Sequence, residues 1–171
     1  MKKPSIELKN NKYLASLSEE THAYTATIYV NGKRFAEVSN RGHGAMDDVR
    51  PFQGGYQAVN ALNKRIAATY PKWGSEFDPK KGDTLDSTLE IICGGLVNDW
   101  LAIKEAKKIL RKISALDEEG DLVQWPAKLK PTPENIARVR AKFPEYTILN
   151  DLHIEDAAAF IFKEKEPCPE S

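Results

Sequence analysis

The sequence predicts an α+β fold: a three-stranded antiparallel sheet packed by two helices, with a small C-terminal helical part. Three observations lead to this prediction. Apolar residues alternate on both sides of an Asn-Gly dipeptide, two later segments carry helical apolar stripes, and short elements bounded by prolines follow residue 117. The length of 171 residues suits one domain, which buries roughly two-thirds of the surface that its unfolded chain exposes.

The first predicted strand is an edge strand over residues 6–17, where the alternation is intermittent and Asn10-Asn11 suggests a bend. A clearer alternation runs from Tyr24 to Val30 and meets Asn31-Gly32, the strongest short-range signal for a β-hairpin. The sheet is therefore expected to form around this hairpin.

A two-residue turn at this point determines the pairing of the two strands. It places Val30 opposite Lys33 and Ile28 opposite Phe35. We therefore expect Ile28 and Phe35 to face the core.

Two helices are expected to cover the sheet. The first spans residues 54–70, where apolar residues recur at steps of three and four, and Pro71 ends it. The second spans about residues 86–114 and opens with the capping-box pattern Ser87-Thr88-Leu89-Glu90. Its apolar positions recur at a mean step close to the coiled-coil repeat of about 3.5 residues. Burial of this stripe against the chain's own sheet is the favoured interpretation, and a homodimer through the long helix is the alternative to a monomer.

Cys93-Gly94-Gly95 interrupts the second helix, where each glycine costs about 1 kcal/mol relative to alanine. Such a cost suggests a reason, and close packing against another backbone is the expected one. A cysteine nucleophile is the alternative, although an apolar setting raises the pKa of a thiol.

The C-terminal part, residues 117–162, is predicted to contain short elements. They are an acidic turn at residues 117–121, a strand over residues 122–125, a helix that begins at Thr132-Pro133-Glu134 and ends before Pro144, a strand over residues 146–149 and a helix over residues 155–162. The tail, residues 163–171, is expected to be frayed. The single domain, residues 1–171, thus comprises the hairpin sheet with the first helix (residues 1–70), the long helix within residues 83–116, the C-terminal part (residues 117–162) and the tail.

Composition narrows the function classes. Lys and Arg number 25, as do Asp and Glu, so the net charge is zero and the whole-protein field favours neither nucleic acid nor anionic membrane. The N-terminus lacks the apolar run of a secretory signal, and no stretch approaches the length of a membrane span. Cys93 and Cys168 have neither disulfide nor metal-ligand spacing. We therefore expect a soluble, cytoplasmic protein with no cofactor.

The segment from Ser39 to Asp48 is the one place where glycines, a cation, an imidazole and paired carboxylates meet. Arg41 with the converging amides of a glycine loop could bind an anion. His43 with Asp47 and Asp48 supplies ligand types suited to a divalent cation, but at least one further ligand is needed. The favoured interpretation is a turn, with Arg41, His43, Asp47 and Asp48 as candidate binding residues.

A second candidate surface is the basic end of the long helix. It contains the cations Lys104, Lys107, Lys108, Arg111 and Lys112 against Glu105 alone. Basic residues in the last turns of a helix complement its dipole, so the cluster is explained without nucleic acid. Nucleic-acid binding by Lys104, Lys107, Lys108, Arg111 and Lys112, together with Arg41, is the alternative.

The run from Tyr24 to Lys33, followed by a helix up to Leu62, resembles the double-stranded RNA-binding domain, which also places a hairpin before an amphipathic helix. That family has a basic cluster at the helix start, where this chain has Met46-Asp47-Asp48, and acids there would repel phosphates. The chain as a whole is similar to uncharacterised small proteins of bacteria and phages that share a hairpin, a Gly-His-Gly loop and a lysine-rich long helix. This resemblance implies an accessory protein that binds a host protein.

The sequence contains no complete catalytic set. We therefore expect a non-enzymatic binding protein that acts through a protein partner, as an inhibitor of a host defence complex would. A nucleic-acid binder and a small metal- or phosphate-dependent enzyme centred on the Gly-His-Gly loop are the alternatives.

Overall fold

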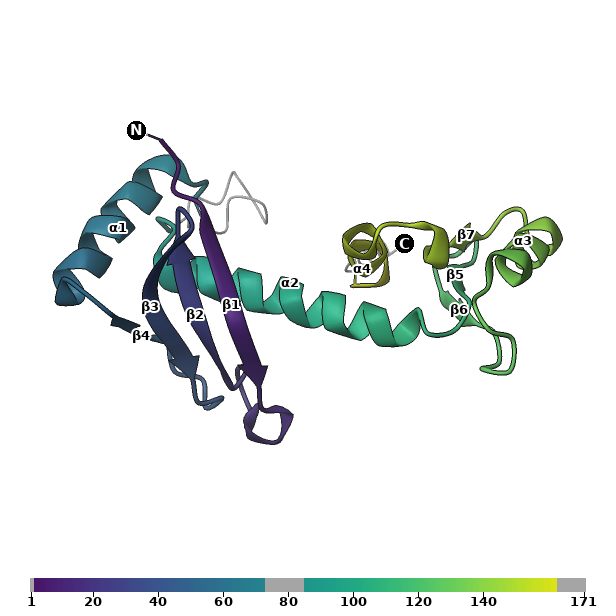
Figure 1. Ribbon diagram of the computed structural model, residues 1–171, viewed down its shortest axis with the longest axis horizontal. Coiled ribbons are helices and arrows are strands. Elements are labelled where there is room, and N and C mark those ends of the chain that lie inside the picture. The colour runs from purple at the N-terminus through teal and green to yellow at the C-terminus, as the bar shows by residue number, and fades with distance from the viewer. Residues whose placement is uncertain (1, 73–84, 163–171) are drawn as a thin grey trace, which may run out of the picture. The chain divides into compact units, whose positions relative to one another are not determined.

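The computed structural model describes residues 2–72 and 85–162. Its contacts divide the chain into two compact units, Met1–Asn98 and Asp99–Ser171 (Figure 1). The division falls inside the long helix α2 (Leu89–Ile109). The expected α+β class is confirmed, with antiparallel sheets and helices in the described residues.

The sheet of unit 1 has four strands in the order β1-β2-β3-β4, all antiparallel: β1 (Ile6–Tyr13), β2 (Tyr24–Val30), β3 (Lys33–Asn40) and β4 (Asp48–Pro51). The prediction of three strands was wrong by one, because β4 has only four residues and begins at the end of the loop of residues 39–48, where no strand was expected. A proline at the end of this strand is tolerated, since β4 is an edge strand. The edge position of β1 is confirmed.

The hairpin between β2 and β3 turns where predicted. Asn31 and Gly32 both have positive φ, 50° and 75°, as a two-residue turn of this type requires. The register differs beyond the second pair, since Ile28 lies opposite Ala36 and Phe35 is the extra residue of an irregularity. The predicted pairing of Ile28 with Phe35 was therefore wrong: Ala36 faces the core beside Ile28, and Phe35 is only half-buried.

β1 bends at the predicted place. Its register with β2 shifts between Lys9 and Lys12, and Asn10 has a φ of 58°. A short 3₁₀ helix, η1 (Ala15–Leu17), then leads into the connection to β2.

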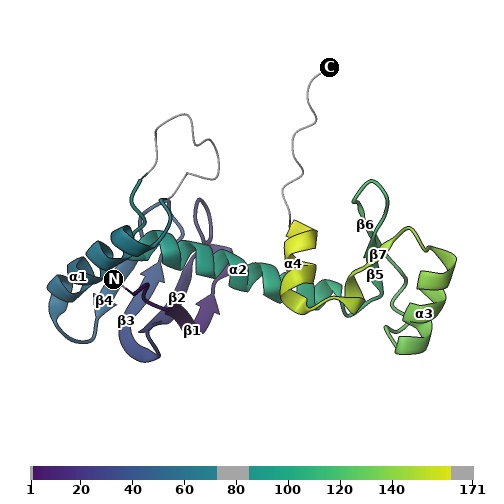
Figure 2. The same cartoon turned by 90° about the horizontal axis from the view of Figure 1, so that it is seen from above.

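Two helices lie on the same side of this sheet, α1 (Gly55–Thr69) and the first part of α2 (Figure 2). The predicted stripe of α1 buries Val59, Leu62 and Ile66, and α2 buries Leu89, Cys93 and Val97. Unit 1 is therefore a two-layer arrangement with its core between sheet and helices.

The start of α2 is held by residues other than those expected. The capping oxygen belongs to Thr88, whose Oγ1 accepts from the Ile91 amide at 3.4 Å, while the Ser87 hydroxyl donates to the Pro71 carbonyl at 2.5 Å. The Leu89 amide donates to Asn63 Oδ1 of α1 at 2.8 Å. Ser87 thus does not cap the helix, because α1 and the residues after it supply competing partners.

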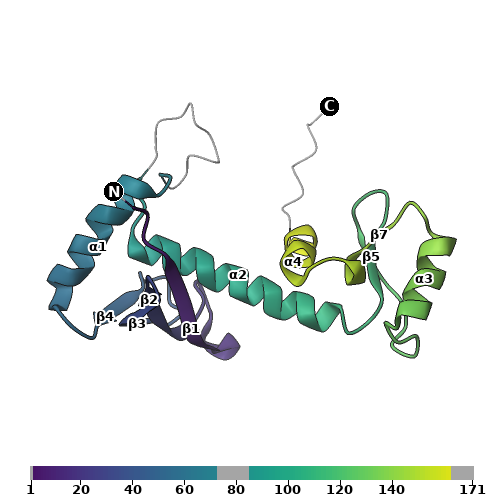
Figure 3. The same ribbon diagram turned by 45° about the horizontal axis from the view of Figure 1, so that its top comes forward.

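Unit 2 contains a three-stranded sheet, which the prediction lacked, in the order β6-β5-β7. Its elements are β5 (Ser114–Leu116), β6 (Leu122–Gln124), α3 (Pro133–Lys142), β7 (Thr147–Ile148), the 3₁₀ helix η2 (Leu149–Asp151) and α4 (Ile154–Phe162) (Figure 3). Its core cluster comprises Ile113, Ala115, Val139 and Ile148.

The long helix ends five residues earlier than expected. Asn150 replaces the missing helical partners: its Nδ2 donates to the carbonyls of Leu110 and Lys112, and its Oδ1 accepts from the Ser114 amide at 2.7 Å. The chain then enters β5. The helix predicted from Thr132 is confirmed, with Thr132 Oγ1 accepting from the Asn135 amide.

The predicted frayed tail, residues 163–171, lies outside the described residues. Within the described ranges, no helix combines the length and apolar character needed to cross a membrane.

Candidate functional site

Unit 1 contains a pocket of about 560 Å³ between one end of the sheet and the first half of α2. Its walls come from the ends of the strands, the connections between them and one face of α2. They are Tyr13 at the end of β1, residues 18–22 of the connection, Tyr24 at the start of β2, Asn40 at the end of β3, the loop residues 45–47 and, from α2, Glu90, Ile91, Gly94, Val97 and Asn98. The β1–β2 connection and the loop after β3 are therefore the parts that shape it.

Gly42 of the Gly-His-Gly loop holds these two connections together. Its carbonyl accepts from three successive amides, those of Glu19, Glu20 and Thr21, at 3.1, 2.9 and 3.3 Å. Its own amide donates to Asn40 Oδ1 at 2.8 Å. Gly42 has a φ of 89°, and an added Cβ would lie 1.9 Å from the Leu17 carbonyl oxygen. Only glycine fits this buried position.

The polar wall of the pocket is a closed hydrogen-bond network. The Tyr24 hydroxyl donates to Asp47 Oδ2 at 2.5 Å, and Asn40 Nδ2 donates to Asp47 Oδ1 at 3.0 Å and to the Ala45 carbonyl at 2.8 Å. Asn40 Oδ1 accepts in turn from Thr21 Oγ1 at 2.9 Å. Asp47 is thus fixed in the wall with both carboxylate oxygens occupied.

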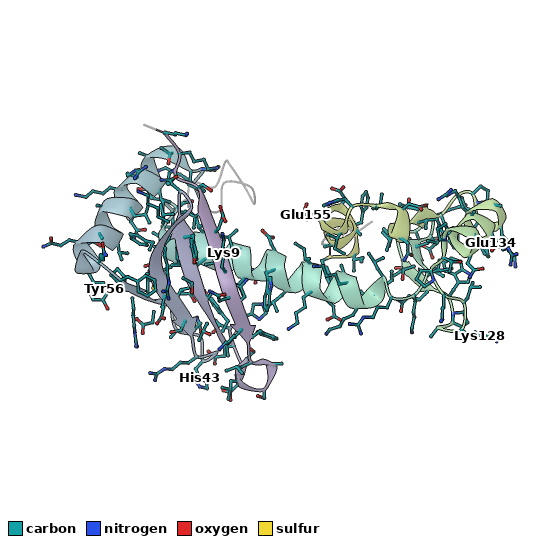
Figure 4. All side chains as sticks on the ribbon, viewed as in Figure 1. Lys9, His43, Tyr56, Lys128, Glu134 and Glu155 are labelled. Carbon is teal, nitrogen blue, oxygen red and sulfur yellow. The ribbon has the colours of Figure 1, made fainter. Side chains whose placement is uncertain are left out.

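The residues proposed from the loop separate in the structure. Asp47 lines the pocket, whereas Arg41 is exposed and does not line it. His43 Nδ1 lies 3.2 Å from Glu19 Oε2 at the outer edge of unit 1 (Figure 4). Asp48 forms an ion pair with Arg50 at 2.6 Å. His43, Asp47 and Asp48 therefore do not converge on one point, and their binding roles stay predictions.

The pocket has an acidic and aromatic character. Four carboxylates, those of Glu19, Glu20, Asp47 and Glu90, are among its lining residues, which include no lysine or arginine in the described part of the chain. Three rings also line it, those of Tyr13, His22 and Tyr24, and the first two meet edge to face at 5.7 Å. Negative charge beside ring faces favours a cation.

Two groups that could act as nucleophiles, the Tyr24 hydroxyl and the Cys93 thiol, favour their neutral forms. The pKa of Tyr24 lies far above its ordinary value, mainly because the hydroxyl is buried. The hydrogen bond to Asp47 and the negative charge of Asp47 raise it further. Burial, followed by the charges of Asp47 and Glu90, raises the pKa of the fully buried Cys93 thiol. Both effects disfavour the anions that nucleophilic catalysis would need.

Gly94 contributes to the pocket by lacking a side chain. An added Cβ at Gly94 would meet nothing within 4 Å among the described residues, and the same holds at Gly95. The expectation that these glycines allow close packing against another backbone was therefore wrong. Gly94 lines the pocket and Gly95 does not. Sequence reasoning identified the unusual glycines but carries no signal for the open space beside Gly94.

The basic helix end belongs to unit 2, and Lys104, Lys107, Lys108 and Arg111 are all exposed. Lys108 pairs with Glu105 at 2.6 Å, and Lys104 Nζ lies 5.0 Å from the Trp100 ring centroid. Nucleic-acid binding by this cluster stays a prediction.

Within residues 2–72 and 85–162, no group of three or more His, Cys, Asp or Glu side chains is arranged to hold a metal ion. Comparison with known proteins gives no relative: no family model matches the chain, and neither a curated protein nor a solved structure is significantly similar to it. The functional argument therefore depends on the pocket itself.

Proposed function

We propose that this protein is a non-enzymatic binding protein that acts through a protein partner, and that the acidic pocket of unit 1 receives a basic side chain of this partner. The observation that carries the proposal is the set of four carboxylates and three rings in one pocket whose described lining residues include no lysine or arginine. Electrostatic complementarity of this kind selects a lysine or arginine side chain over a neutral one.

Exposed apolar side chains around the pocket favour a protein over a small polar molecule. Met46, which lines the pocket, is 78% exposed, and Leu14 and Leu17 of the adjoining connection are 50% and 48% exposed. Apolar side chains around a polar pocket are typical of protein interaction sites. A partner segment that carries one basic residue between apolar neighbours would satisfy both features.

The polar wall supports binding rather than catalysis. Tyr24, Asn40 and Asp47 are hydrogen-bonded to one another, so their side chains are already in place before a ligand arrives. A preorganised wall reduces the entropy lost on binding. The neutral Tyr24 and Cys93 supply no activated nucleophile.

The size of the pocket suits a side chain together with part of its backbone. Its volume of about 560 Å³ lies within the range of roughly 300–1,000 Å³ found for ligand sites. A short peptide is therefore the appropriate probe.

The experiment is a titration followed by NMR chemical shifts, with acetyl-Leu-Lys-Leu-amide and a control peptide in which norleucine replaces lysine. We expect the lysine peptide to shift the amides of Met46, Asp47 and Gly94, and the norleucine peptide to leave them nearly unchanged. Equal shifts with both peptides, or shifts confined to residues outside the pocket, would contradict the proposal.

Neutralisation of one carboxylate tests the role of charge. Glu90→Gln keeps the shape of the side chain and should weaken the lysine peptide about two- to fivefold, the range for loss of one partly solvated ion pair. Glu37→Gln is the matched control, because Glu37 is exposed on β3 and does not line the pocket.

The narrower expectations stay predictions. No relative supports an inhibitor of a host defence complex or a phage origin. Nucleic-acid binding by the helix end predicts salt-dependent retention on DNA or RNA that is lost when Lys104, Lys107 and Lys108 become glutamate.

A further inference from the structure

A second hollow of unit 1 has the opposite charge. It has a volume of about 750 Å³ and lies between the β2–β3 hairpin and α1. Its lining includes the cations Lys33, Arg34 and Arg65, and no aspartate or glutamate among the described residues. We name this hollow the basic groove.

The three cations line the same hollow, and none of them has an ion-pair partner among the described residues. The Arg34 guanidinium carbon lies 4.2 Å from the centroid of the Phe52 ring, which orients this side chain. No carboxylate of the described residues forms an ion pair with Lys33, Arg34 or Arg65. Three unneutralised like charges at one hollow favour an anionic occupant.

The floor of the basic groove is apolar. Ala58, Ala61 and Leu62 lie on one face of α1 and line it together with Phe52, which is 42% exposed. Two rings, Phe35 and Phe52, also line the groove, but Phe35 is half-buried and the Arg34 guanidinium lies over the Phe52 ring, so a nucleic acid base finds little free ring face to stack on. The aliphatic residues accommodate an apolar side chain. The preferred occupant is therefore an acidic protein segment that also carries an apolar residue.

The chain itself contains such a segment, the turn between β5 and β6 (Figure 2). Glu118 and Glu119 occupy the centre of this turn and are exposed, and no described cation forms an ion pair with either. Leu122, which follows at the start of β6, is 42% exposed.

Hydrogen bonds within the turn define its backbone. The Gly120 amide donates to the Asp117 carbonyl at 3.0 Å, the Asp121 amide donates to Asp117 Oδ1 at 2.7 Å, and Gly120 has a φ of 79°. The two carboxylates are thus presented by a preorganised backbone, which lowers the entropy cost of docking.

We propose that the β5–β6 turn of a second copy of this chain occupies the basic groove. Glu118 and Glu119 meet the cations Lys33, Arg34 and Arg65, and Leu122 contacts the apolar floor. The contact joins two unlike surfaces, so each copy offers one groove and one turn, and association continues into a ring or a chain of copies. This contact is independent of the acidic pocket.

The test is sedimentation velocity of the full chain over a range of concentrations. We expect the average mass of the wild-type protein to rise with concentration at low salt and to fall towards the monomer at high salt. Lys33→Glu with Arg34→Glu, and separately Glu118→Lys with Glu119→Lys, should each weaken self-association by about a hundredfold or more, because like charges then face each other. All four side chains are exposed, so these variants are expected to fold, and circular dichroism checks this.

Mixing the two double variants provides the decisive arm. The groove variant retains a wild-type turn and the turn variant retains a wild-type groove, and the two reversed surfaces also match each other. We expect each variant alone to be monomeric and the mixture to form complexes. Lys64→Glu, on α1 outside the groove, and Glu145→Lys, outside the turn, are matched controls and should associate like the wild type.

Three outcomes would overturn the proposal. A wild-type protein that stays monomeric at every concentration has no such contact. Self-association that neither double variant weakens uses another surface, such as the long helix. Retention of a single-stranded oligonucleotide that is lost with Lys33→Glu and Arg34→Glu, without self-association, assigns the basic groove to nucleic acid instead.

Discussion

The two adjacent glycines of α2 allow a quantitative test of the packing around the acidic pocket. Glycine in a helix costs about 1 kcal/mol relative to alanine, because its backbone loses more freedom on folding. Among the residues that the structure describes, an added Cβ at Gly94 or at Gly95 would meet nothing within 4 Å. Since neither methyl group meets an obstacle, Gly94→Ala and Gly95→Ala should each raise the free energy of unfolding by about 1 kcal/mol.

The measurement is urea-induced unfolding followed by far-UV circular dichroism, with thermal unfolding as a second observable. For a chain of this length, the expected gain corresponds to a rise of about 2–4 °C in Tm for each variant. A loss of about 1 kcal/mol or more in Gly94→Ala, as overpacking against a neighbouring backbone produces, would refute the open space beside Gly94. Stabilisation by Gly95→Ala alone would lead to the same conclusion.

Three further predictions concern the walls of the pocket. Gly42→Ala should lower the free energy of unfolding, measured in urea, by about 2 kcal/mol or more, because the added Cβ would meet the Leu17 carbonyl. Gly32→Ala is the control: its Cβ would meet no described residue, so only the positive φ of Gly32 makes the substitution unfavourable. Equal losses in the two variants would show that the clash at Gly42 is relieved. Because the pKa of Tyr24 is raised, its contribution to stability is fully present below the ordinary value of 10.0 and is lost as the pH rises above that value. Tyr24→Phe removes the hydrogen bond to Asp47, so it should lower the free energy of unfolding by about 1–2 kcal/mol at neutral pH and make the loss of stability at alkaline pH shallower. An unchanged loss of stability at alkaline pH would show that Tyr24 is not its cause. In a Cys168→Ser chain, the fully buried Cys93 should react with a thiol reagent at neutral pH only at the rate at which the protein opens, and immediate reaction without urea would show that the thiol is accessible.

Local signals in the sequence were sufficient for the hairpin turn and for the buried face of α1. Asn31-Gly32 combines two residues that tolerate positive φ, so the turn needs no tertiary context. The stripe of Val59, Leu62 and Ile66 identified the buried face of α1 by its period alone.

The missed features depend on tertiary contacts. β4 is only four residues long and is defined by its pairing with β3, and the displacement of Phe35 from its predicted pair is visible only once both strands are placed. The helix stop after Ile109 depends on Asn150, which is 40 residues from Leu110 in sequence. The sequence around residue 110 gives no local signal for this bond, because nothing there indicates which distant side-chain amide will donate to the Leu110 carbonyl.

The candidate site was located only in part. The loop around Asp47 was identified because it is unusual in composition, but the expected roles of its residues changed: Gly42 organises the loop, and Asp47 lines the pocket with Tyr24 and Asn40. Glu19, Glu20 and Glu90 escaped notice, since carboxylates on a surface connection and at a helix start are common. Only the fold brings them into one pocket.

The most direct test of the acidic pocket compares Gly94→Leu with Gly95→Leu. Both replace glycine by the same side chain on adjacent positions of α2, but only the first fills the pocket. Titration of both variants with acetyl-Leu-Lys-Leu-amide, followed by NMR, measures the consequence. We predict that Gly94→Leu abolishes the binding seen with the wild-type protein and that Gly95→Leu retains it. Retained binding in Gly94→Leu, with both variants folded, would contradict the assignment of this pocket as the site for a basic side chain.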